Sequence, residues 1–155
     1  MGESLDLRWR TVLVTDSGAG LGREVAVRAA RRGAAVVAVD RDAAAAEATA
    51  VVVRRSRVPA WAVQADLDHP DDLLLLAGRL RDLGGADLLV TASPAAVPAF
   101  VDALSHRRGR PGLVPTVVVV GSEPPPDLPD GVRLTCLDPA GRSVDDLARA
   151  ALTGG

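Results

Sequence analysis

The chain has 155 residues, of which 48% are hydrophobic and 25% are charged, and its formal net charge is −2. This length predicts a single domain over residues 1–155, and the composition favours a globular fold over disorder. The small negative charge gives no general electrostatic reason to bind nucleic acid or an acidic membrane surface. A lone cysteine, Cys136, provides no disulfide framework. Together with the lack of an apolar signal segment or a membrane-length run, it predicts a cytoplasmic protein.

The most informative stretch covers residues 11–40. A short apolar strand, Val12–Val14, leads into the glycine-rich turn Asp16–Gly22. The next apolar residues recur at helical spacing until Gly33, and a second apolar strand, Ala34–Val39, ends at Asp40. This order of strand, glycine turn, helix and strand predicts a βαβ unit whose helix N-terminus could face an anion.

Strands and helices alternate along the rest of the chain. This alternation predicts an α/β fold with a doubly wound, mostly parallel sheet of about six strands, Rossmann-like in type. In the lead-in segment, Trp9 is expected to pack under the first strand. The further strands are predicted over Trp61–Ala65, Asp87–Thr91, Thr116–Val120 and Val132–Leu137, and the further helices over Asp42–Arg55, Leu73–Leu83, Ala99–Arg107 and Ser143–Leu152.

The connection between the fifth and sixth strands departs from this pattern. It consists of about ten residues, Ser122–Gly131, and is rich in proline. Parallel neighbours normally need a crossover of a dozen or more residues, usually a helix. We therefore expect the helix between these strands to be missing and one sheet face near them to be bare. A partner subunit is the simplest cover for a bare apolar face, which predicts an oligomer.

Several motifs resemble those of the short-chain dehydrogenase/reductase family, in the same order along nearly the whole chain. Thr15–Arg23 resembles the TGxxxGxG turn of that family, and Asp66-Leu67 resembles its adenine-contacting pair after the third strand. Asp87–Pro94 is similar to its fourth strand and the following Asn-Asn-Ala-Gly motif, and Val132–Ala140 to its sixth strand and Pro-Gly turn. Ser122 falls where the family carries its catalytic serine.

The resemblance implies a site for NAD or NADP. Asp40 would favour NAD, because a carboxylate pairs with the 2′-hydroxyl of the ribose and repels a 2′-phosphate, whereas Arg41 could accept NADP. Asp16 stands where the family has a glycine, so binding would place a carboxylate beside the pyrophosphate. The cofactor-binding residues that the resemblance implies are Asp16, Ser17, Gly18, Gly20, Leu21, Gly22, Asp40, Arg41, Asp66, Leu67 and Ala92.

The reductive chemistry of that family depends on a Tyr-x-x-x-Lys pair, for which the sequence offers no counterpart. The chain contains neither tyrosine nor lysine. The resemblance therefore implies a pseudoenzyme with no catalytic residue of its own, working as a homo-oligomer or as a hetero-oligomer with a complete dehydrogenase paralogue. No metal site is expected, because the histidines lack partners at ligand spacing.

Two other interpretations remain open. The chain could be an NAD(P)-dependent oxidoreductase that a partner's residues complete. Alternatively, Asp16–Gly22 also resembles the D-x-G-x-G-x-G loop of S-adenosylmethionine-dependent methyltransferases. In that case Asp40 would hold the ribose hydroxyls and Asp66 would lie near the adenine. The antiparallel hairpin that usually ends a methyltransferase sheet has no clear counterpart in the sequence.

Overall fold

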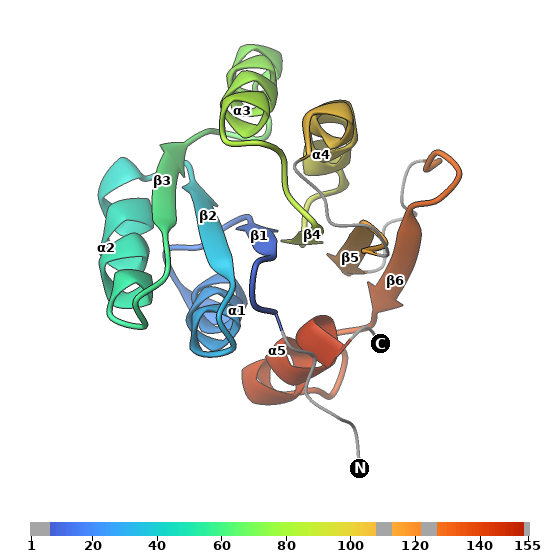
Figure 1. Ribbon diagram of the computed structural model, residues 1–155. Coiled ribbons are helices and arrows are strands. Elements are labelled where there is room, and N and C mark those ends of the chain that lie inside the picture. Colours follow the sequence, from blue (N-terminus) through green and yellow to red (C-terminus); the bar gives the residue numbers. More distant parts are fainter. Residues whose placement is uncertain (1–6, 108–112, 122–126, 154–155) are drawn as a thin grey trace.

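A computed structural model describes residues 7–107, 113–121 and 127–153 (Figure 1). Six strands form one sheet in the order β3-β2-β1-β4-β5-β6, and all described neighbours pair in parallel. This is the doubly wound Rossmann order, so the predicted fold class is confirmed. The strands are β1 (Thr11–Val14), β2 (Ala35–Asp40), β3 (Ala60–Gln64), β4 (Leu88–Thr91), β5 (Thr116–Val120) and β6 (Arg133–Leu137).

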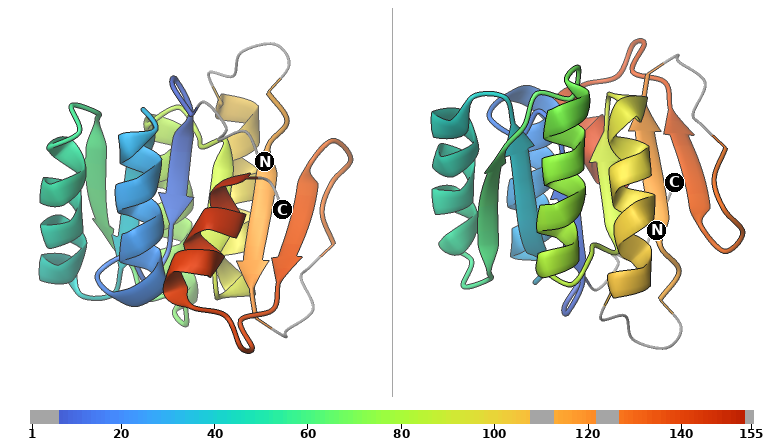
Figure 2. Two further views of the ribbon diagram at one scale, coloured as in Figure 1. Left: turned by 90° about the horizontal axis from the view of Figure 1, so that it is seen from below. Right: turned by 90° about the horizontal axis from the view of Figure 1, so that it is seen from above.

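Helices cover both faces of the sheet (Figures 1 and 2). One face carries α1 (Gly20–Arg31), α2 (Ala43–Arg54) and α5 (Val144–Thr153), and the other carries α3 (Pro70–Asp82) and α4 (Val97–Asp102). Within the described ranges, no helix combines the length and the hydropathy needed to cross a bilayer.

The helix predicted over Ala99–Arg107 is wrong in its bounds. The observed α4 begins at Val97 and is flanked by 3-10 turns over Pro94–Ala96 and Ala103–His106. Proline is tolerated in the first turn of a helix, where its missing N–H costs nothing, so Pro98 does not delay the start of α4.

Each strand of the sheet interior contributes side chains to two hydrophobic cores. In β1, Val12 and Val14 face the core under α1 and α5, while Leu13 faces the core under α3 and α4. In β5, Val118 and Val120 face the core under α1 and α5. Val117 and Val119 face the core under α3 and α4. Burial on both faces explains why these strands are continuous apolar runs instead of alternating ones.

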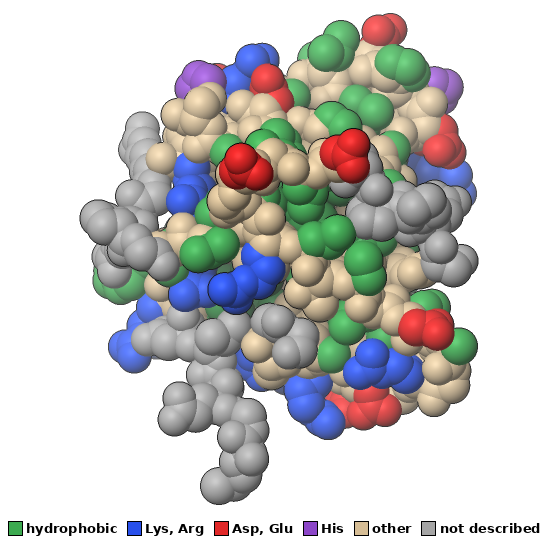
Figure 3. Space-filling view, turned by 90° about the vertical axis from the view of Figure 1, so that its right-hand side faces the viewer, with side chains coloured by type: hydrophobic (Ala, Val, Ile, Leu, Met, Phe, Trp, Pro, Cys, Tyr) green, Lys and Arg blue, Asp and Glu red, His purple; other side chains and the backbone are tan. Residues whose placement is uncertain are grey.

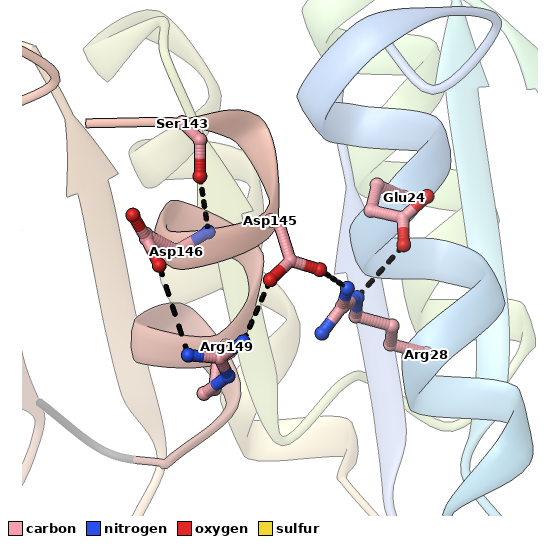
Figure 4. Close-up of polar contacts among 6 residues, drawn as sticks. All are labelled: Glu24, Arg28, Ser143, Asp145, Asp146 and Arg149. Carbon is pink, nitrogen blue, oxygen red and sulfur yellow. Dashed lines mark hydrogen bonds and ion pairs between the residues drawn. The ribbon is translucent and has the colours of Figure 1, made fainter.

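A set of polar contacts joins the last helix to the first (Figure 4). Arg28 on α1 pairs with Asp145 on α5, and its Nε lies 2.8 Å from Oε1 of Glu24. Arg149 also pairs with Asp145, at 2.6 Å, so both arginines share one carboxylate. At the start of α5 the Ser143 hydroxyl accepts a hydrogen bond from the Asp146 N–H at 3.1 Å and thereby caps the helix.

The sheet face that carries α3 and α4 is uncovered at its β6 edge. Leu134 is 39% exposed and Cys136 is also exposed, whereas their neighbours on β5, Val117 and Val119, are buried. The described residues between β5 and β6, Gly121 and 127–132, contain no helix, and Ser122 and the rest of 122–126 lie outside the described residues. The predicted bare face is therefore confined to β6. Figure 3, which views the molecule from the β6 edge, shows hydrophobic side chains in the middle of that side.

The prediction for Trp9 is wrong. Its side chain is 74% exposed and its backbone is left-handed, with φ of 67°. Leu7 enters the core instead and is 1% exposed. The hydrogen bond from Arg10 N to Leu7 O, at 3.0 Å, closes a turn. This turn directs Leu7 inward and Trp9 outward.

Candidate nucleotide-binding site

A cleft of about 500 Å³ lies outside the carboxyl ends of the central strands. The order of the sheet reverses between β1 and β4, which lead to helices on opposite faces. In doubly wound sheets this switch point is where ligands bind. The residues that line the cleft lie at the end of β2 or after β1, β2, β3 and β4, and they are Asp16, Ala19, Gly20, Val39, Asp40, Arg41, Ala65, Asp66, Leu67, Asp68 and Ser93.

The glycine turn between β1 and α1 is held against its neighbours by hydrogen bonds. The N–H of Ser17 donates to Val39 O at 3.0 Å, and the N–H of Gly18 donates to Oδ2 of Asp40, also at 3.0 Å. On the α2 side, the Thr49 hydroxyl donates to Ser17 O at 2.7 Å. The chain's own hydrogen bonds therefore fix the turn to the end of β2 and to α2.

Close packing explains two of the glycines, and backbone conformation explains a third. A Cβ at Gly18 would lie 2.5 Å from Cβ of Ala45, and a Cβ at Gly22 would lie 2.4 Å from the carbonyl oxygen of Asp16. Gly20 differs, because its φ of +54° favours glycine while no atom lies within 4 Å of its Cβ position. Gly18 and Gly22 thus permit the fold of the turn, and Gly20 leaves bare backbone facing the cleft.

The N-terminus of α1 opens on the same cleft. Its N-cap is Ala19, which has no side chain to cap the first amides, and its first turn contains no acidic residue. Uncapped amides and the positive end of the helix dipole favour a bound anion. This end of the cleft fits the pyrophosphate of a dinucleotide.

Carboxylates dominate the remainder of the cleft. Asp16, Asp40, Asp66 and Asp68 line it, against the single guanidinium of Arg41 among the described lining residues. Partial burial raises the pKa of the Asp16 carboxyl above its ordinary value of 3.8, and the nearby charge of Asp40 raises it further. Arg41 opposes this rise in pKa, and Asp68 adds to it. The surroundings of Asp16 therefore disfavour added negative charge.

Asp40 lines the cleft at the carboxyl end of β2. It ends β2 and is half-buried, and its Oδ1 accepts a hydrogen bond from Asp42 N at 2.9 Å while Oδ2 accepts from Gly18 N. A carboxylate has about four acceptor positions, so both oxygens can still accept from hydroxyl groups in the cleft. Arg41 is exposed at the rim.

The segment after β3 forms the opposite wall. Asp66 N donates to Oδ2 of Asp72 at 2.8 Å, and Oδ1 of Asp66 accepts from Asp68 N at 3.0 Å, so its carboxylate is fixed within its own turn. Leu67 packs partly against the core under α3 and presents an apolar surface to the cleft. An apolar side chain beside a fixed carboxylate can hold a purine ring.

The end of β4 is tied to the end of β1. The hydroxyl oxygens of Thr15 and Thr91 lie 2.7 Å apart, and Thr91 also exchanges hydrogen bonds with the backbone of Ser93 at 2.9 Å. Ser93 lines the cleft, whereas Ala92 is exposed beside it.

The structure brings together Asp16, Gly20, Asp40, Arg41, Asp66 and Leu67 of the predicted site. Ser17, Gly18, Leu21 and Gly22 shape the turn behind the cleft without lining it. Sequence reasoning missed Asp68 and Ser93, although their positions just after the third and fourth strands could have indicated them. Among the described residues, no group of three or more His, Cys, Asp or Glu side chains could hold a metal ion.

Comparisons with known proteins agree on one family. Residues 10–108 match the family model described as short chain dehydrogenase. The 7alpha-hydroxysteroid dehydrogenase of Escherichia coli K12 is 31% identical over 101 residues, which cover 64% of this chain and 40% of that protein. Nothing in these matches supports the methyltransferase alternative.

Solved structures extend the likeness. The Pseudomonas aeruginosa RhlG/NADP active-site complex superposes with a TM-score of 0.65 at 26% identity, over 79% of this chain and 56% of that one. A short-chain dehydrogenase from Sphingobium yanoikuyae in complex with NADPH gives a TM-score of 0.55 at 29% identity, over 73% and 54% of the two chains. The chain thus spans 40% of the length of the curated relative and little more than half that of these structures.

Proposed function

Because this chain belongs to the short-chain dehydrogenase family, we propose that it binds a nicotinamide dinucleotide in the cleft and does not itself reduce a carbonyl group. The proposal that the chain does not itself reduce a carbonyl group rests on the absence of tyrosine and lysine from its sequence. In the family, a lysine lowers the pKa of a tyrosine so that its phenol can exchange a proton with the substrate. Among the described residues that line the cleft, the titratable side chains are aspartates and one arginine, and none of them is a counterpart of that tyrosine.

Different residues of the cleft would contact different parts of the dinucleotide. The bare backbone of Gly20 and the first amides of α1 would lie against the pyrophosphate. Asp40 would accept hydrogen bonds from the ribose hydroxyls and thereby favour NAD, while the exposed Arg41 would moderate that preference. Leu67 and Val39 would flank the adenine. When bound, the nicotinamide would supply or accept a hydride, but the chain has no tyrosine or lysine to carry the accompanying proton as in the family.

The uncovered edge at β6 supports a role within an assembly. Leu134 and Cys136 are exposed on the face where the family's tyrosine-bearing helix is missing from the sequence. Exposed apolar side chains on a strand edge support a partner at this edge. A second candidate function rests on the same observation: a complete dehydrogenase could cover this edge and supply the missing proton carrier.

The test combines binding with turnover. The purified chain is titrated with NAD, NADP and S-adenosylhomocysteine while thermal unfolding is followed, since a ligand at 100 times its Kd stabilises by about 2.7 kcal/mol. We expect stabilisation by NAD above that by NADP, and none by S-adenosylhomocysteine. Carbonyl reduction with NADH and NADPH is then assayed for the chain alone and mixed with a full-length dehydrogenase.

The outcomes separate the two halves of the proposal. Binding of NAD without turnover by the chain alone supports both halves. Robust cofactor-dependent reduction by the chain alone contradicts the non-catalytic role. Failure of both dinucleotides to stabilise the chain contradicts nucleotide binding.

A further inference from the structure

The strand β6 lies at the edge of the sheet and pairs with β5 on one side only (Figures 1 and 2). Proteins usually protect such an edge with a proline, a bulge or charged side chains, because its free backbone groups can pair with another strand. The five residues of β6, RLTCL, include no proline or glycine, and their one charged residue is the first, Arg133. Most of the β6 edge therefore lacks this protection.

The hydrogen bonds to β5 show which backbone groups of β6 are free. Arg133 N donates to Pro115 O at 2.9 Å, and Gly121 N donates to Leu137 O at 3.0 Å. In a parallel ladder, residues that bond to the neighbouring strand alternate with residues that point away from it. Leu134 and Cys136 therefore direct their N–H and C=O groups away from β5. None of these four groups has a hydrogen-bond partner within the described residues.

The side chains of the same two residues are apolar and open to solvent. Leu134 and Cys136 are in register with Val117 and Val119, so they lie on the sheet face that carries α3 and α4. Leu134 is 39% exposed, and Cys136 is exposed as well. Thr135 lies between them on the other face and is partly exposed. The free backbone groups of the β6 edge thus belong to residues whose side chains favour burial.

We propose that β6 of a second copy of this chain pairs antiparallel with this edge, with the two Thr135 residues directly opposite each other on a two-fold axis. In this register Leu134 of each copy lies opposite Cys136 of the other. Each of these two pairs exchanges two hydrogen bonds, so all four free groups of each copy gain a partner. A shift by one residue would set free groups against groups already bonded to β5, and a shift by two would leave part of each strand unpaired.

The side chains also match in this register, which favours a second copy as the partner. Leu134 and Cys136 form two apolar cross-strand pairs on one face, and the two threonines form a pair on the other. Arg133 lies opposite Leu137, and Asp138 follows β6 directly. Antiparallel pairing therefore brings Arg133 of each copy towards Asp138 of the other, whereas parallel pairing would set like charges side by side. An isologous interface needs such a self-complementary surface.

This proposal deepens the role within an assembly proposed above by naming the partner and the register, and it does not depend on nucleotide binding. Two five-residue strands bury less surface than a standard interface of about 1,600 Å². We therefore expect a reversible dimer with a Kd in the micromolar range.

The first test measures dimerisation of the full chain by analytical ultracentrifugation from micromolar to millimolar concentration. Leu134→Lys places a charge on the edge and should raise the dimer Kd about tenfold or more. Leu74→Lys is the matched control, because Leu74 is 71% exposed on α3, away from β6. It should dimerise like the unaltered chain. Circular dichroism checks that both variants fold.

The second test reads the register from cross-linking through a single cysteine. Thr135→Cys combined with Cys136→Ser places two thiols directly opposite each other, with about 4.5 Å between Cα atoms, and should form a disulfide-linked dimer on mild oxidation. In the unaltered chain, the two Cys136 residues would be about 8 Å apart, beyond the reach of a disulfide. Arg133→Cys combined with Cys136→Ser separates the thiols further and measures cross-linking by random collision.

The outcomes separate this proposal from the others. A concentration-dependent dimer that Leu134→Lys weakens and Leu74→Lys does not, with efficient cross-linking at position 135, supports it. A monomer at millimolar concentration, equal effects of the two lysine variants, or cross-linking at Cys136 as efficient as at position 135 would each overturn it. A monomer that is still stabilised by NAD would overturn the dimer and leave nucleotide binding standing. Association only with a full-length dehydrogenase would also overturn it and favour the second candidate function. If the cysteine variants fail to fold, the lysine variants decide.

Discussion

Oδ2 of Asp40 accepts a hydrogen bond from the backbone N–H of Gly18, with 3.0 Å between nitrogen and oxygen. The same carboxylate accepts from Asp42 N through its other oxygen, at 2.9 Å. One side chain therefore holds the glycine turn, starts the connection to α2 and lines the nucleotide cleft. We therefore expect stability and nucleotide preference to be linked at this residue.

Replacement of Asp40 should affect both properties. Asp40→Asn keeps the size of the side chain but leaves one oxygen in place of two, so one of the two backbone donors loses its acceptor. We expect a loss of about 1–2 kcal/mol in the free energy of unfolding, measured by urea denaturation. The preference for NAD over NADP, measured by calorimetry, should also fall, because an amide does not repel a 2′-phosphate. Asp130→Asn, an exposed carboxylate far from the cleft in sequence, should change neither quantity.

Asp16 should limit dinucleotide affinity in a pH-dependent way. Because its pKa in the folded chain is raised, the carboxyl loses its charge as the pH falls towards and through that raised value, and NAD binding should tighten. Asp16→Asn removes the charge at every pH, and asparagine tolerates the φ of 48° at this position. We expect about tenfold tighter NAD binding at pH 7.5 and a flatter pH profile. Calorimetry across pH 4.5–8 checks this, and equal affinities of the two proteins would contradict it.

The same shift in pKa has a consequence for stability. A carboxyl with a raised pKa binds its proton more tightly in the folded state than in the unfolded state. The free energy of unfolding therefore decreases as the pH rises from the ordinary value of 3.8 to the raised value, and the deficit persists above it. Asp16→Asn should be slightly more stable than the unaltered chain at pH 7, and this advantage should vanish below pH 3. Urea denaturation at both pH values measures the difference.

The glycines of the turn should differ in how much stability a substitution by alanine costs. Gly22→Ala would place a Cβ 2.4 Å from a backbone oxygen and should cost about 3 kcal/mol of stability. Gly20→Ala meets no neighbour and should cost about 1–2 kcal/mol for its positive φ. Gly20→Ala should nevertheless weaken NAD binding, since its Cβ would cover backbone that faces the cleft. Chemical denaturation and calorimetry on both variants check this contrast, and a larger loss of stability for Gly20→Ala would contradict it.

The hydroxyl groups of Ser17 and Thr49 should differ in their contribution to stability. Oγ of Ser17 is fully buried and has no hydrogen-bond partner among the described residues, so Ser17→Ala should be neutral or stabilise by up to about 1 kcal/mol. Thr49→Val keeps the shape of Thr49 but removes the donor to Ser17 O, and should cost about 1–2 kcal/mol. Thermal and urea unfolding measure both variants. A destabilised Ser17→Ala would show that the hydroxyl is hydrogen-bonded after all.

The fold was largely predictable because its signals are local. Apolar runs of strand length, a glycine turn and helix-period repeats lie within short windows, so β1, α1 and β2 were located to within about two residues. The predicted fifth strand, Thr116–Val120, matches β5. The bounds of α4 were missed because two prolines there are compatible with either a loop or the first turn of a helix.

The sequence by itself determined which residue types the chain lacks and largely which elements it forms, because composition and periodicity need no knowledge of long-range contacts. Only the tertiary structure decided where side chains from separate strands meet. It gathered Asp16, Asp40, Asp66 and Asp68 around one cleft, turned Trp9 outward and placed it with Arg10 and Arg57 at the other end of the sheet. Strand order and register set these distances, and both are fixed by packing between residues far apart in the chain.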